Sequence, residues 1–480
     1  MSDPEPYRYL TIARRIADEI EAGLYREGER LPSVRLLRGT YEISATTAMR
    51  VLVELEQDGL AEARPRSGFY VRTRTPPGLA HVPAPTTTAP APRPADVNGL
   101  IERIFKANAS AEGILPFGAA EIDEALLPHK ELAVAVARTV REEAAGLLAY
   151  GPTAGDPRLR RRLARLLGER GVAVAPQEIV VTAGETDALS LALLALTRPG
   201  DTVAVESPCF FGILQWIEAL GLRAVEIATD PHRGIDLDEL ERVADTVPIA
   251  ALALNPTFHN PFGFAMPADR MRGLLDLAEK RDLPIVEDDV YGDLHHGSRP
   301  RRPLKSFDKT GRVLYCSSFS KTLAPGFRVG WCVPGRHAEA FERARAPRNA
   351  GVATLTQRAL ARYLDGRAYG RHLRELRGLF ASQAPRVRAL VSEAFPPGTR
   401  ITEPEGGFVF WVEVPPPFDA LDFHEAALRE GISTAPGPIF SASGGFRDAF
   451  RLSMGRRLSV DEERGIRRLG MIAHRLCEAG

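Results

Sequence analysis

The 480-residue sequence predicts an α/β protein with a small helical domain at its N-terminus and a large domain built on a mostly parallel sheet. Three observations lead to this prediction. A proline-rich segment divides the chain, helical periodicity dominates the residues before it, and short apolar runs alternate with long helices after it. We therefore expect domains at residues 1–75 and 98–480, joined by a linker at residues 76–97.

The composition excludes several classes of protein. Lys plus Arg and Asp plus Glu each number 62, and hydrophobic residues make up 44% of the chain, as in ordinary globular proteins. These values exclude a disordered or collagen-like chain and give no overall basic bias toward nucleic acid or membranes. The cysteines form no Cys-x-x-Cys pair, and His295-His296 is expected to be structural or exposed, so we predict no metal site. Neither a signal peptide nor a membrane-spanning stretch is evident, and we expect a cytoplasmic protein.

The first 75 residues show the pattern of three short helices and a hairpin. Apolar residues recur at helical spacing over 9–20, and residues 31–33 open a second helix with a proline in its first turn. Ser44 is a favourable N-cap for a third helix that stops at Gly59. Turn residues within 60–72 separate two strand-like runs, which predicts a hairpin. These are the parts of a winged helix-turn-helix, whose third helix enters the major groove of DNA.

Charge alone does not decide whether this domain binds DNA. Residues 1–75 hold 12 basic and 12 acidic side chains, so a solvated surface and a DNA-binding surface are equal alternatives. The expected wing is locally basic, however, because Arg64 and Arg66 lie in a stretch where no acid occurs between residues 63 and 75.

Four short motifs of this domain resemble the GntR-type winged helix. They are Leu31-Pro32-Ser33-x-Arg35, Ile43-Ser44-x-Thr46-Thr47, Leu55-Glu56-x-Asp58-Gly59-Leu60 and Gly68-Phe69-Tyr70-Val71. Ala45 and Met49 stand where relatives often carry arginine, which favours contacts to phosphates over contacts to bases. The resemblance implies DNA-binding roles for Arg35, Ser44, Thr46, Thr47, Arg50, Arg64, Arg66 and Gly68.

Beyond residue 98, short apolar runs alternate with amphipathic helices. Runs that are apolar on both faces predict parallel strands covered by helices on both sides. From about residue 350 the chain adds helices and further strands, which predicts a smaller C-terminal α+β subdomain. We expect strands at 178–182, 202–206, 224–227, 249–254, 284–288, 313–317, 407–414 and 449–453, and helices at 157–170, 236–244 and 268–280.

Lys321 is the candidate nucleophile of the large domain. It is one of only six lysines and follows directly after the strand expected at 313–317. Ligands of open α/β sheets bind beyond the carboxyl ends of strands, where loss of water lowers the pKa of a lysine and frees its amine to attack an aldehyde. Ser318 and Arg328 lie nearby in the sequence and are suited to bind a phosphate. Taken alone, this segment favours the alternative of a surface lysine that follows a strand.

Polar residues also follow three other expected strands. Asp288 ends one strand, and a buried carboxylate facing a pyridine nitrogen keeps that nitrogen protonated. Tyr291 follows three residues later, Asn260 follows another strand, and Gly184 precedes a helix whose N-terminus forms an anion site. Each piece alone is weak evidence, but polar residues at the ends of four strands of one sheet predict a single binding pocket.

In this order, the segments resemble the fold type I aminotransferases that use pyridoxal 5'-phosphate. The resemblance covers about residues 115–470 and is most specific at Ser318-x-Ser320-Lys321-x-x-x-Pro325-Gly326-x-Arg328. It implies that Lys321 bonds covalently to the cofactor aldehyde, that Asp288 contacts the pyridine nitrogen, and that Tyr291 contacts the 3-oxygen. These three are the expected catalytic residues. Further cofactor contacts are implied for Gly184, Glu185, Thr186, Phe210, Asn260, Ser318, Ser320 and Arg328, and substrate contacts for Gly118, for Arg451, and for Tyr150 given across the dimer interface.

A GntR-type domain followed by an aminotransferase-like domain resembles the MocR group of bacterial transcriptional regulators. The resemblance implies a cytoplasmic homodimer that binds double-stranded operator DNA, with each DNA-binding domain docked on the other subunit in a domain-swapped arrangement. It also implies pyridoxal phosphate on Lys321 and a small effector, which is an amine, an amino acid or pyridoxal phosphate itself. Two alternatives stay open: an active aminotransferase with a vestigial DNA-binding domain, and a constitutive DNA-binding protein whose large domain is inert.

Overall fold

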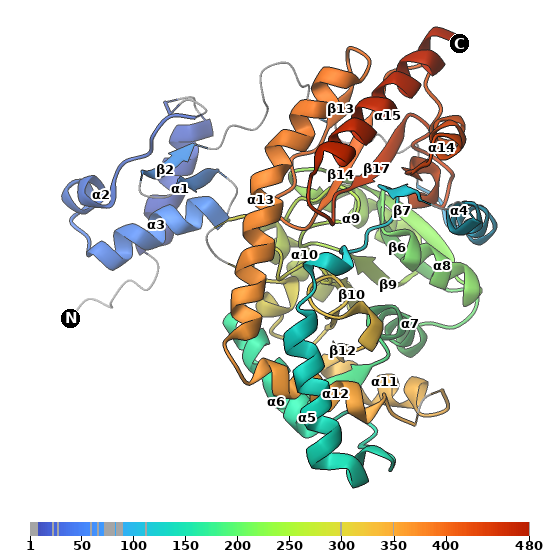
Figure 1. Ribbon diagram of the computed structural model, residues 1–480. Coiled ribbons are helices and arrows are strands. Elements are labelled where there is room, and N and C mark those ends of the chain that lie inside the picture. The colour runs from blue at the N-terminus through green and yellow to red at the C-terminus, as the bar shows by residue number, and fades with distance from the viewer. Residues whose placement is uncertain are drawn as a thin grey trace.

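The computed structural model describes residues 8–21, 24–25, 28–57, 60–64, 67–71, 82, 90–110, 113–297, 300–348 and 350–479. These residues form a small head, residues 8–71, and a large body, residues 90–479 (Figure 1), so the α/β fold with a separate helical N-terminal domain is confirmed. None of the helices in these ranges is both long and apolar enough to cross a membrane.

The described part of the head contains three helices and a hairpin. They are α1 (Arg8–Glu21), α2 (Val34–Tyr41), α3 (Ala45–Gln57) and the antiparallel strands β1 (Ala61–Arg64) and β2 (Gly68–Val71). Side chains cap the starts of α2 and α3, since Ser33 Oγ accepts from Leu36 N at 3.2 Å and Ser44 Oγ accepts from Thr47 N at 3.1 Å. Apolar residues from the three helices and both strands pack into one core of their own, which fixes the direction of α3.

A mixed, mostly parallel sheet forms the centre of the body. Its strands are β3 (Arg93–Pro94), β5 (Val180–Thr182), β6 (Thr202–Ser207), β7 (Arg223–Asp230), β8 (Gly234–Ile235), β9 (Ile249–Leu254), β10 (Ile285–Asp288), β11 (Val313–Ser318) and β12 (Gly330–Val333). Their order is β3-β7-β6-β9-β10-β11-β12-β5, with β8 paired to β7. Strands β7, β6, β9, β10 and β11 are parallel. Because parallel strands end at the same edge, the residues that follow them lie close together.

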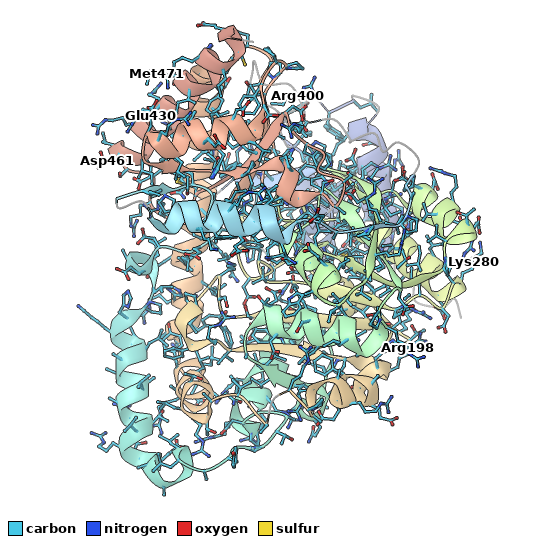
Figure 2. All side chains as sticks on the ribbon, turned by 90° about the vertical axis from the view of Figure 1, so that its right-hand side faces the viewer. Arg198, Lys280, Arg400, Glu430, Asp461 and Met471 are labelled. Atoms are coloured by element: carbon cyan, nitrogen blue, oxygen red, sulfur yellow. The ribbon has the colours of Figure 1, made fainter. Side chains whose placement is uncertain are left out.

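Helices cover both faces of this sheet. They are α4 (Asn98–Ser110), α5 (His129–Leu147), α6 (Pro157–Glu169), α7 (Glu185–Leu196), α8 (Phe211–Ala219), α9 (Leu237–Thr246), α10 (Ala268–Lys280), α11 (Ala338–Arg345) and α12 (Thr354–Leu364). Helix α7 is apolar on nearly all sides and packs against β10, β11 and β12, so it is buried as a core helix. Charged side chains such as Arg198 and Lys280 lie at the margin of the body (Figure 2).

The C-terminal part of the body is a smaller α+β layer, as the sequence predicts. It contains α13 (Ala368–Ala394), β13 (Arg400–Ile401), β14 (Val409–Glu413), α14 (Ala420–Arg429), β15 (Ile432–Ser433), β16 (Ala435–Pro436), β17 (Ala449–Ser453) and α15 (Val460–Ala479). Its antiparallel sheet has the order β13-β14-β17-β16, and α13 packs against α15. The short strand β4 (Leu115–Pro116) pairs in parallel with β15, which ties the start of the body to this layer.

Seven strands of the described body were not foreseen from the sequence: β3, β4, β8, β12, β13, β15 and β16. Strand β12 lies between β11 and β5 and runs antiparallel to both. A four-residue run that begins with Gly330 has little periodicity of its own, so only its place between two strands reveals it. Residues 93–94, which the sequence places at the end of the linker, form β3 and pair with β7, and Arg223 Nη2 donates to Pro92 O at 2.6 Å.

A buried ion pair lies directly behind the carboxyl edge of the central sheet. Arg170, which follows α6, pairs with Asp289, which follows β10, and their side chains are 7% and 0% exposed. Arg170 Nη2 donates to Asp289 Oδ1 at 3.1 Å, and the Tyr315 hydroxyl donates to Asp289 Oδ2 at 2.5 Å. Burial raises the pKa of Asp289, while the guanidinium of Arg170 opposes that rise. The two charges thus compensate each other inside the protein.

Removing one partner of this pair should destabilise the body. We expect Asp289→Ala to lower the free energy of unfolding by about 3–5 kcal/mol, because Arg170 then remains buried without its counter-charge. Urea denaturation followed by tryptophan fluorescence measures the change. Glu102→Ala is the control, since Glu102 pairs with Lys106 at 2.5 Å but the two side chains are 63% and 75% exposed, and it should leave the free energy of unfolding nearly unchanged. Equal effects of the two substitutions would contradict the assignment.

Candidate functional site

A cavity of about 180 Å³ lies at the carboxyl edge of the central sheet. It is lined by the loops after β6, β9, β10 and β11, by the start of α7, by the loop after β4 and by strand β17. This arrangement brings together most of the residues that the sequence assigns to a cofactor and substrate. They are Gly118, Glu185, Thr186, Phe210, Asn260, Asp288, Tyr291, Ser318, Ser320, Lys321, Arg328 and Arg451.

Lys321 lies in the turn after β11 and lines the cavity. Its Nζ donates to Ala120 O at 2.7 Å. Burial lowers the pKa of Lys321, although the carboxyl groups of Glu185 and Glu121 oppose that shift. The amine therefore loses its proton more readily than an exposed lysine does, as a nucleophilic amine requires.

Asp288 ends β10 and is held from two sides. Its Oδ1 accepts from Val290 N at 3.2 Å, and Asn255 Nδ2 donates to Asp288 O at 2.6 Å. Asn255 also accepts from Asn260 N at 2.6 Å and is 1% exposed, so it joins the ends of β9 and β10. The sequence analysis assigned no role to Asn255. The available signal was an Asn-Pro pair directly after a buried strand, which by itself indicates only a turn.

The start of α7 and the segment after β11 form a cradle suited to an anion. Gly184 is the N-cap of α7 at φ +91°, and a Cβ at this position would collide with the guanidinium of Arg328. Arg328 Nη2 donates to Ala183 O at 3.3 Å, which holds the guanidinium over the helix N-terminus. Ser320 N donates to Ser318 Oγ at 3.2 Å on the other side. Free backbone donors of a helix start, an arginine and two hydroxyls are the donor set that binds a phosphate.

Three buried polar atoms from residues that line the cavity have no hydrogen-bond partner within the described structure. They are Tyr291 Oη, Arg451 Nε and Glu185 Oε1. Tyr291 is 0% exposed, and burial raises the pKa of its phenol, so it is a neutral hydroxyl. Buried polar groups are normally hydrogen-bonded, so unpartnered ones at a cavity indicate a missing ligand. Pyridoxal phosphate fits this set, because its 3-oxygen is a partner for a phenol and its phosphate fits the cradle.

Arg451 on β17 is a buried arginine whose bonds are to neutral oxygens. It is 1% exposed, and it donates to Asn260 Oδ1 at 3.0 Å and to Gly118 O at 2.6 Å. Among the described residues it forms no ion pair with a carboxylate. Burial lowers the pKa of Arg451 to about 10. A ligand carboxylate would supply the missing negative charge.

Phe210 precedes α8 and lines the same cavity, with its ring centroid 5.0 Å from that of Phe211. Tyr150, in contrast, is not brought to the cavity within one chain. Its side chain is 94% exposed, next to Leu148 at 93%. The sequence analysis expects Tyr150 to reach the site of a second subunit, and its position on the surface leaves it available for that contact.

The residues expected to bind DNA lie on the surface of the head. Arg35, Thr46, Arg50 and Gly68 are exposed. Ser44 is exposed but serves α3 as its cap, and its Oγ lies 2.8 Å from the Oγ1 of Thr47, which is half-buried. Gly68 takes φ +118° in the wing, where a residue with a Cβ would be strained. Arg66 lies outside the described residues.

The wing and the outer face of α3 differ in part from expectation. Arg64 forms an ion pair with Glu62 at 2.7 Å and lies 4.2 Å from the ring centroid of Tyr70, so its charge is partly neutralised. The helical periodicity of the sequence predicts that Val53 lies on the outer face of the third helix with Met49. Met49 is 38% exposed, but Val53 is only 5% exposed and does not belong to the core of the head. This expectation is wrong because the body covers the second half of α3.

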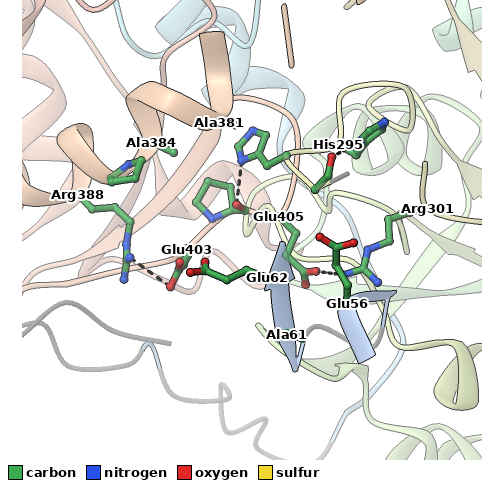
Figure 3. Close-up of a pocket in the computed structure, with 14 residues that line it drawn as sticks. Glu56, Ala61, Glu62, His295, Arg301, Ala381, Ala384, Arg388, Glu403 and Glu405 are labelled. Atoms are coloured by element: carbon green, nitrogen blue, oxygen red, sulfur yellow. Dashed lines mark hydrogen bonds and ion pairs between the residues drawn. The ribbon is translucent and has the colours of Figure 1, made fainter. Parts of the chain in front are cut away.

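A second cavity, of about 200 Å³, lies between head and body (Figure 3). Glu56 and Glu62 line it from the head. On the side of the body, Arg388 pairs with Glu403 at 3.2 Å and Arg301 pairs with Glu405 at 2.5 Å. His295 and His296 also line it, and their ring nitrogens contact backbone carbonyls. In the described part of the chain, no group of three or more His, Cys, Asp or Glu side chains is arranged to hold a metal ion.

Comparisons with known proteins agree with this geometry. Residues 114–463 match the family of class I and II aminotransferases, and residues 8–71 match the gntR family of bacterial regulatory proteins. An uncharacterized HTH-type transcriptional regulator of Escherichia coli, YjiR, is 36% identical over 98% of this chain and 100% of its own length. The 2-aminoadipate transaminase of Thermus thermophilus is 32% identical over 75% of this chain and 89% of its own. The crystal structure of LysN, an α-aminoadipate aminotransferase of Thermus thermophilus in complex with N-(5'-phosphopyridoxyl)-L-leucine, matches with a TM-score of 0.72 at 30% identity, over 79% of this chain and 95% of its own.

Gly184 is needed in the cradle at the start of α7 for two reasons. Its backbone has a positive φ, and a Cβ at this position would collide with Arg328. We expect Gly184→Ala to weaken pyridoxal phosphate binding by about tenfold or more, because the Cβ displaces Arg328 in addition to straining the backbone. Gly200→Ala is the matched control, since Gly200 has φ +93° but nothing within 4 Å of its Cβ position. It should reduce stability without changing cofactor affinity. Fluorescence titration of the apoprotein measures both variants, and equal losses of affinity would contradict the cradle.

Proposed function

The chain belongs to the family of class I and II aminotransferases and carries a gntR-family domain, and from this premise we propose that it is a MocR-type transcriptional regulator. The cofactor of this fold is pyridoxal 5'-phosphate. The observation that carries the proposal is the presence, on one chain, of a capped α3 whose first turns are exposed and of a cavity with the full donor set around Lys321. The domain boundaries at residues 75 and 98 are part of the proposal.

Each residue at the cavity has a defined task toward the cofactor. The bound cofactor supplies an aldehyde and an electron-withdrawing pyridine ring. Asp288 holds the proton at the pyridine nitrogen, and Tyr291 and Asn260 orient the ring through its 3-oxygen. Phe210 packs on the ring and keeps water from that face. The residues for the phosphate are Gly184, Glu185, Thr186, Ser318, Ser320 and Arg328, and Lys321 presents its neutral amine to the aldehyde.

Arg451 defines the class of effector. Its buried guanidinium has no carboxylate partner in the described chain, so it binds the carboxylate of an amino acid, with Gly118 in the adjacent loop. The ligand's amine then lies on the side of Lys321. A simple amine, or pyridoxal phosphate itself, would occupy the same cavity without using Arg451.

The loop after β10 links the cavity to the head. Tyr291 lines the cofactor cavity, and at Gly297 of the same loop a Cβ would stand 3.8 Å from Glu56 Oε1 on α3. Leu294 N donates to Tyr291 O at 2.7 Å, which keeps this segment compact. An effector that contacts two arrangements of this loop differently shifts the position of the head, and this is how binding is read out on DNA.

The protein acts as a homodimer. In a domain-swapped arrangement each head makes, on the body of the second copy, the contact that Glu54 and Glu56 make here with the body of their own chain. Val134 and Val140 on α5 are 53% and 46% exposed, and Leu148 and Tyr150, which follow α5 in the chain, are 93% and 94% exposed. An exposed group of large apolar residues marks an interaction surface. A second copy covers it and receives Tyr150 at its own site. Operator DNA is its macromolecular partner, and the cytoplasm is its location because the operator is there.

A working aminotransferase with a vestigial head is the second candidate. The observation that favours it is that Lys321, Asp288 and Tyr291 all lie at the cavity of the body. Conversion of bound aldehyde to amine by an amino acid, followed by turnover on a keto acid, supports this candidate. Steep salt-dependent shifts of promoter fragments support the regulator. A constitutive DNA-binding protein with an inert body would bind DNA and take up no cofactor.

Lys321→Ala separates these possibilities. We expect wild-type protein to turn yellow with pyridoxal phosphate and to retain a borohydride-trapped adduct at Lys321 by mass spectrometry. The variant should lose the colour, the adduct and the effect of amino acids on promoter binding, while still binding DNA. Lys309→Ala, at an exposed lysine, should behave as wild type. A wild-type protein that stays colourless, or an effector response that survives in Lys321→Ala, contradicts the proposal.

Contact between head and body should depend on Glu54 of α3. Burial raises the pKa of Glu54, while Arg272 and Arg302 of the body lower it, so the carboxylate faces two arginines. We expect Glu54→Lys to release the head and to speed proteolysis within residues 76–97 about fivefold, the effect of roughly 1 kcal/mol. Adding Arg272→Glu should restore the slow rate. Glu339→Lys, at an exposed position of the body, should change nothing. Unchanged proteolysis in Glu54→Lys would show that this contact does not hold the head.

A further inference from the structure

Glu185 is an acidic residue at a place that should favour an anion. It is the first residue of α7, directly after the Gly184 N-cap, where the cradle for the cofactor phosphate lies. Its side chain is buried, 8% exposed, and lines the cavity with Lys321 and Asp288. An ionised carboxylate beside a bound phosphate would repel it. The position of Glu185 therefore needs a physical explanation.

The carboxyl groups of Glu185 and Asp288 line the same cavity and face each other within hydrogen-bonding range. Two ionised carboxylates offer only acceptors, so a bond between them requires that one carries a proton. Burial raises the pKa of Glu185 well above its usual range, and the charge of Asp288 raises it further. Four titratable groups on neighbouring elements interact electrostatically with Glu185 or Asp288: Lys321, Asp289, Tyr291 and Cys316.

The hydrogen bonds around the pair show which partner keeps the proton. Asp288 Oδ1 accepts from Val290 N at 3.2 Å and lies 3.5 Å from Asn255 Nδ2, so donors surround this carboxyl group. Glu185 Oε1 is buried and has no partner in the described structure. Donors stabilise the ionised form and their absence favours the neutral form. The negative charge therefore resides on Asp288 and the proton on Glu185.

We propose that Glu185 is a positioning residue of the cofactor site, a neutral acid that donates to Asp288 and holds its carboxylate toward the pyridine nitrogen. The proposal rests on the pyridoxal phosphate site proposed above and extends it to a residue that does not contact the ring itself. The pair then carries a single negative charge, which matches one protonated pyridine nitrogen. Ionisation of Glu185 adds a second negative charge next to the phosphate cradle and weakens cofactor binding.

This role makes cofactor affinity depend on pH in a defined direction. The binding-competent form of Glu185 is neutral, so it is present below its pKa and is lost as pH rises through that value. Affinity should therefore fall at high pH in the wild-type protein. Glu185→Gln keeps a donor for Asp288 but cannot ionise, so its affinity should not fall in this way. Glu185→Ala lacks the donor and should bind more weakly at every pH.

Pyridoxine 5'-phosphate is the suitable probe, because it has neither the aldehyde nor an amine and cannot bond to Lys321. Its Kd is measured by fluorescence titration of the full-length apoprotein from about pH 7 upward, where the phosphate is mostly a dianion. We expect the wild-type Kd to rise by up to about tenfold for each pH unit above the pKa of Glu185, and the Kd of Glu185→Gln to stay nearly constant. Glu239→Gln is the control, since Glu239 is also buried but accepts from Ala228 N at 2.6 Å, away from the cavity. It should follow the wild type.

Infrared spectroscopy of the apoprotein tests the shared proton without any cofactor. Burial also raises the pKa of Glu287 to about 8, so this carboxyl group contributes its own C=O band at neutral pH. The difference spectrum of wild type minus Glu185→Gln should therefore show one C=O stretch of a protonated carboxyl group, and that of wild type minus Glu239→Gln should show none. Parallel pH profiles of wild type and Glu185→Gln, or a wild type minus Glu185→Gln difference spectrum without this band, would overturn the proposal. Failure of the cofactor site would look different. The probe would then bind at no pH, while the infrared band would still report the proton on Glu185.

Discussion

Burial of charge at the carboxyl edge of the central sheet is the constraint on which the rest of the structure depends. Behind this edge the charges of Arg170 and Asp289 neutralise each other inside the protein. In front of it the half-buried Lys321 and the buried Arg451 donate to neutral oxygens, and Tyr291 has no partner for its hydroxyl within the described residues. Uncompensated buried groups reduce stability, and they persist where a ligand supplies what the chain does not. The ion pair behind the edge therefore stabilises the fold, whereas the polar groups in front of the edge are available to a ligand.

In the head, too, the residues that contact the body and the residues that are exposed lie on different surfaces. Its 12 basic and 12 acidic residues cancel in the sequence, but some of the described ones lie on different faces of the head. Glu54 and Glu56 of α3 face arginines and the loop of the body, whereas Arg35 and Arg50 are exposed. A neutral domain can therefore present one face to a basic partner and another to phosphates. The net charge of the domain predicts neither the contact with the body nor the contact with phosphates, because screened charges interact over distances shorter than the domain.

The two sites are joined by a short and well-bonded path. The strand β10 delivers Asp288 to the cavity, and the loop that continues from it passes Tyr291 and ends against the head at Gly297. A change at the ring nitrogen or at the 3-oxygen thus has only one loop to cross before it reaches α3. The carboxyl pair of Glu185 and Asp288 lies at the start of this path, which places a proton-dependent element where cofactor binding and head position meet.

Local pattern was enough to predict the helices of the head with the Ser44 cap, most strands of the sheet, and the lysine segment around Lys321, because periodicity, caps and short motifs depend on neighbouring residues. The second helix begins at Val34 after the Ser33 cap, so Pro32 precedes the helix instead of lying in its first turn as expected. Long-range pairing decided the rest. The antiparallel insertion of β12, the covering of Val53 by the body, the bridging bonds of Asn255 and the contact of Glu185 with Asp288 all join segments far apart in the chain. No window of sequence contains both partners of such a contact, so strand order and burial had to bring them together before their chemistry became visible.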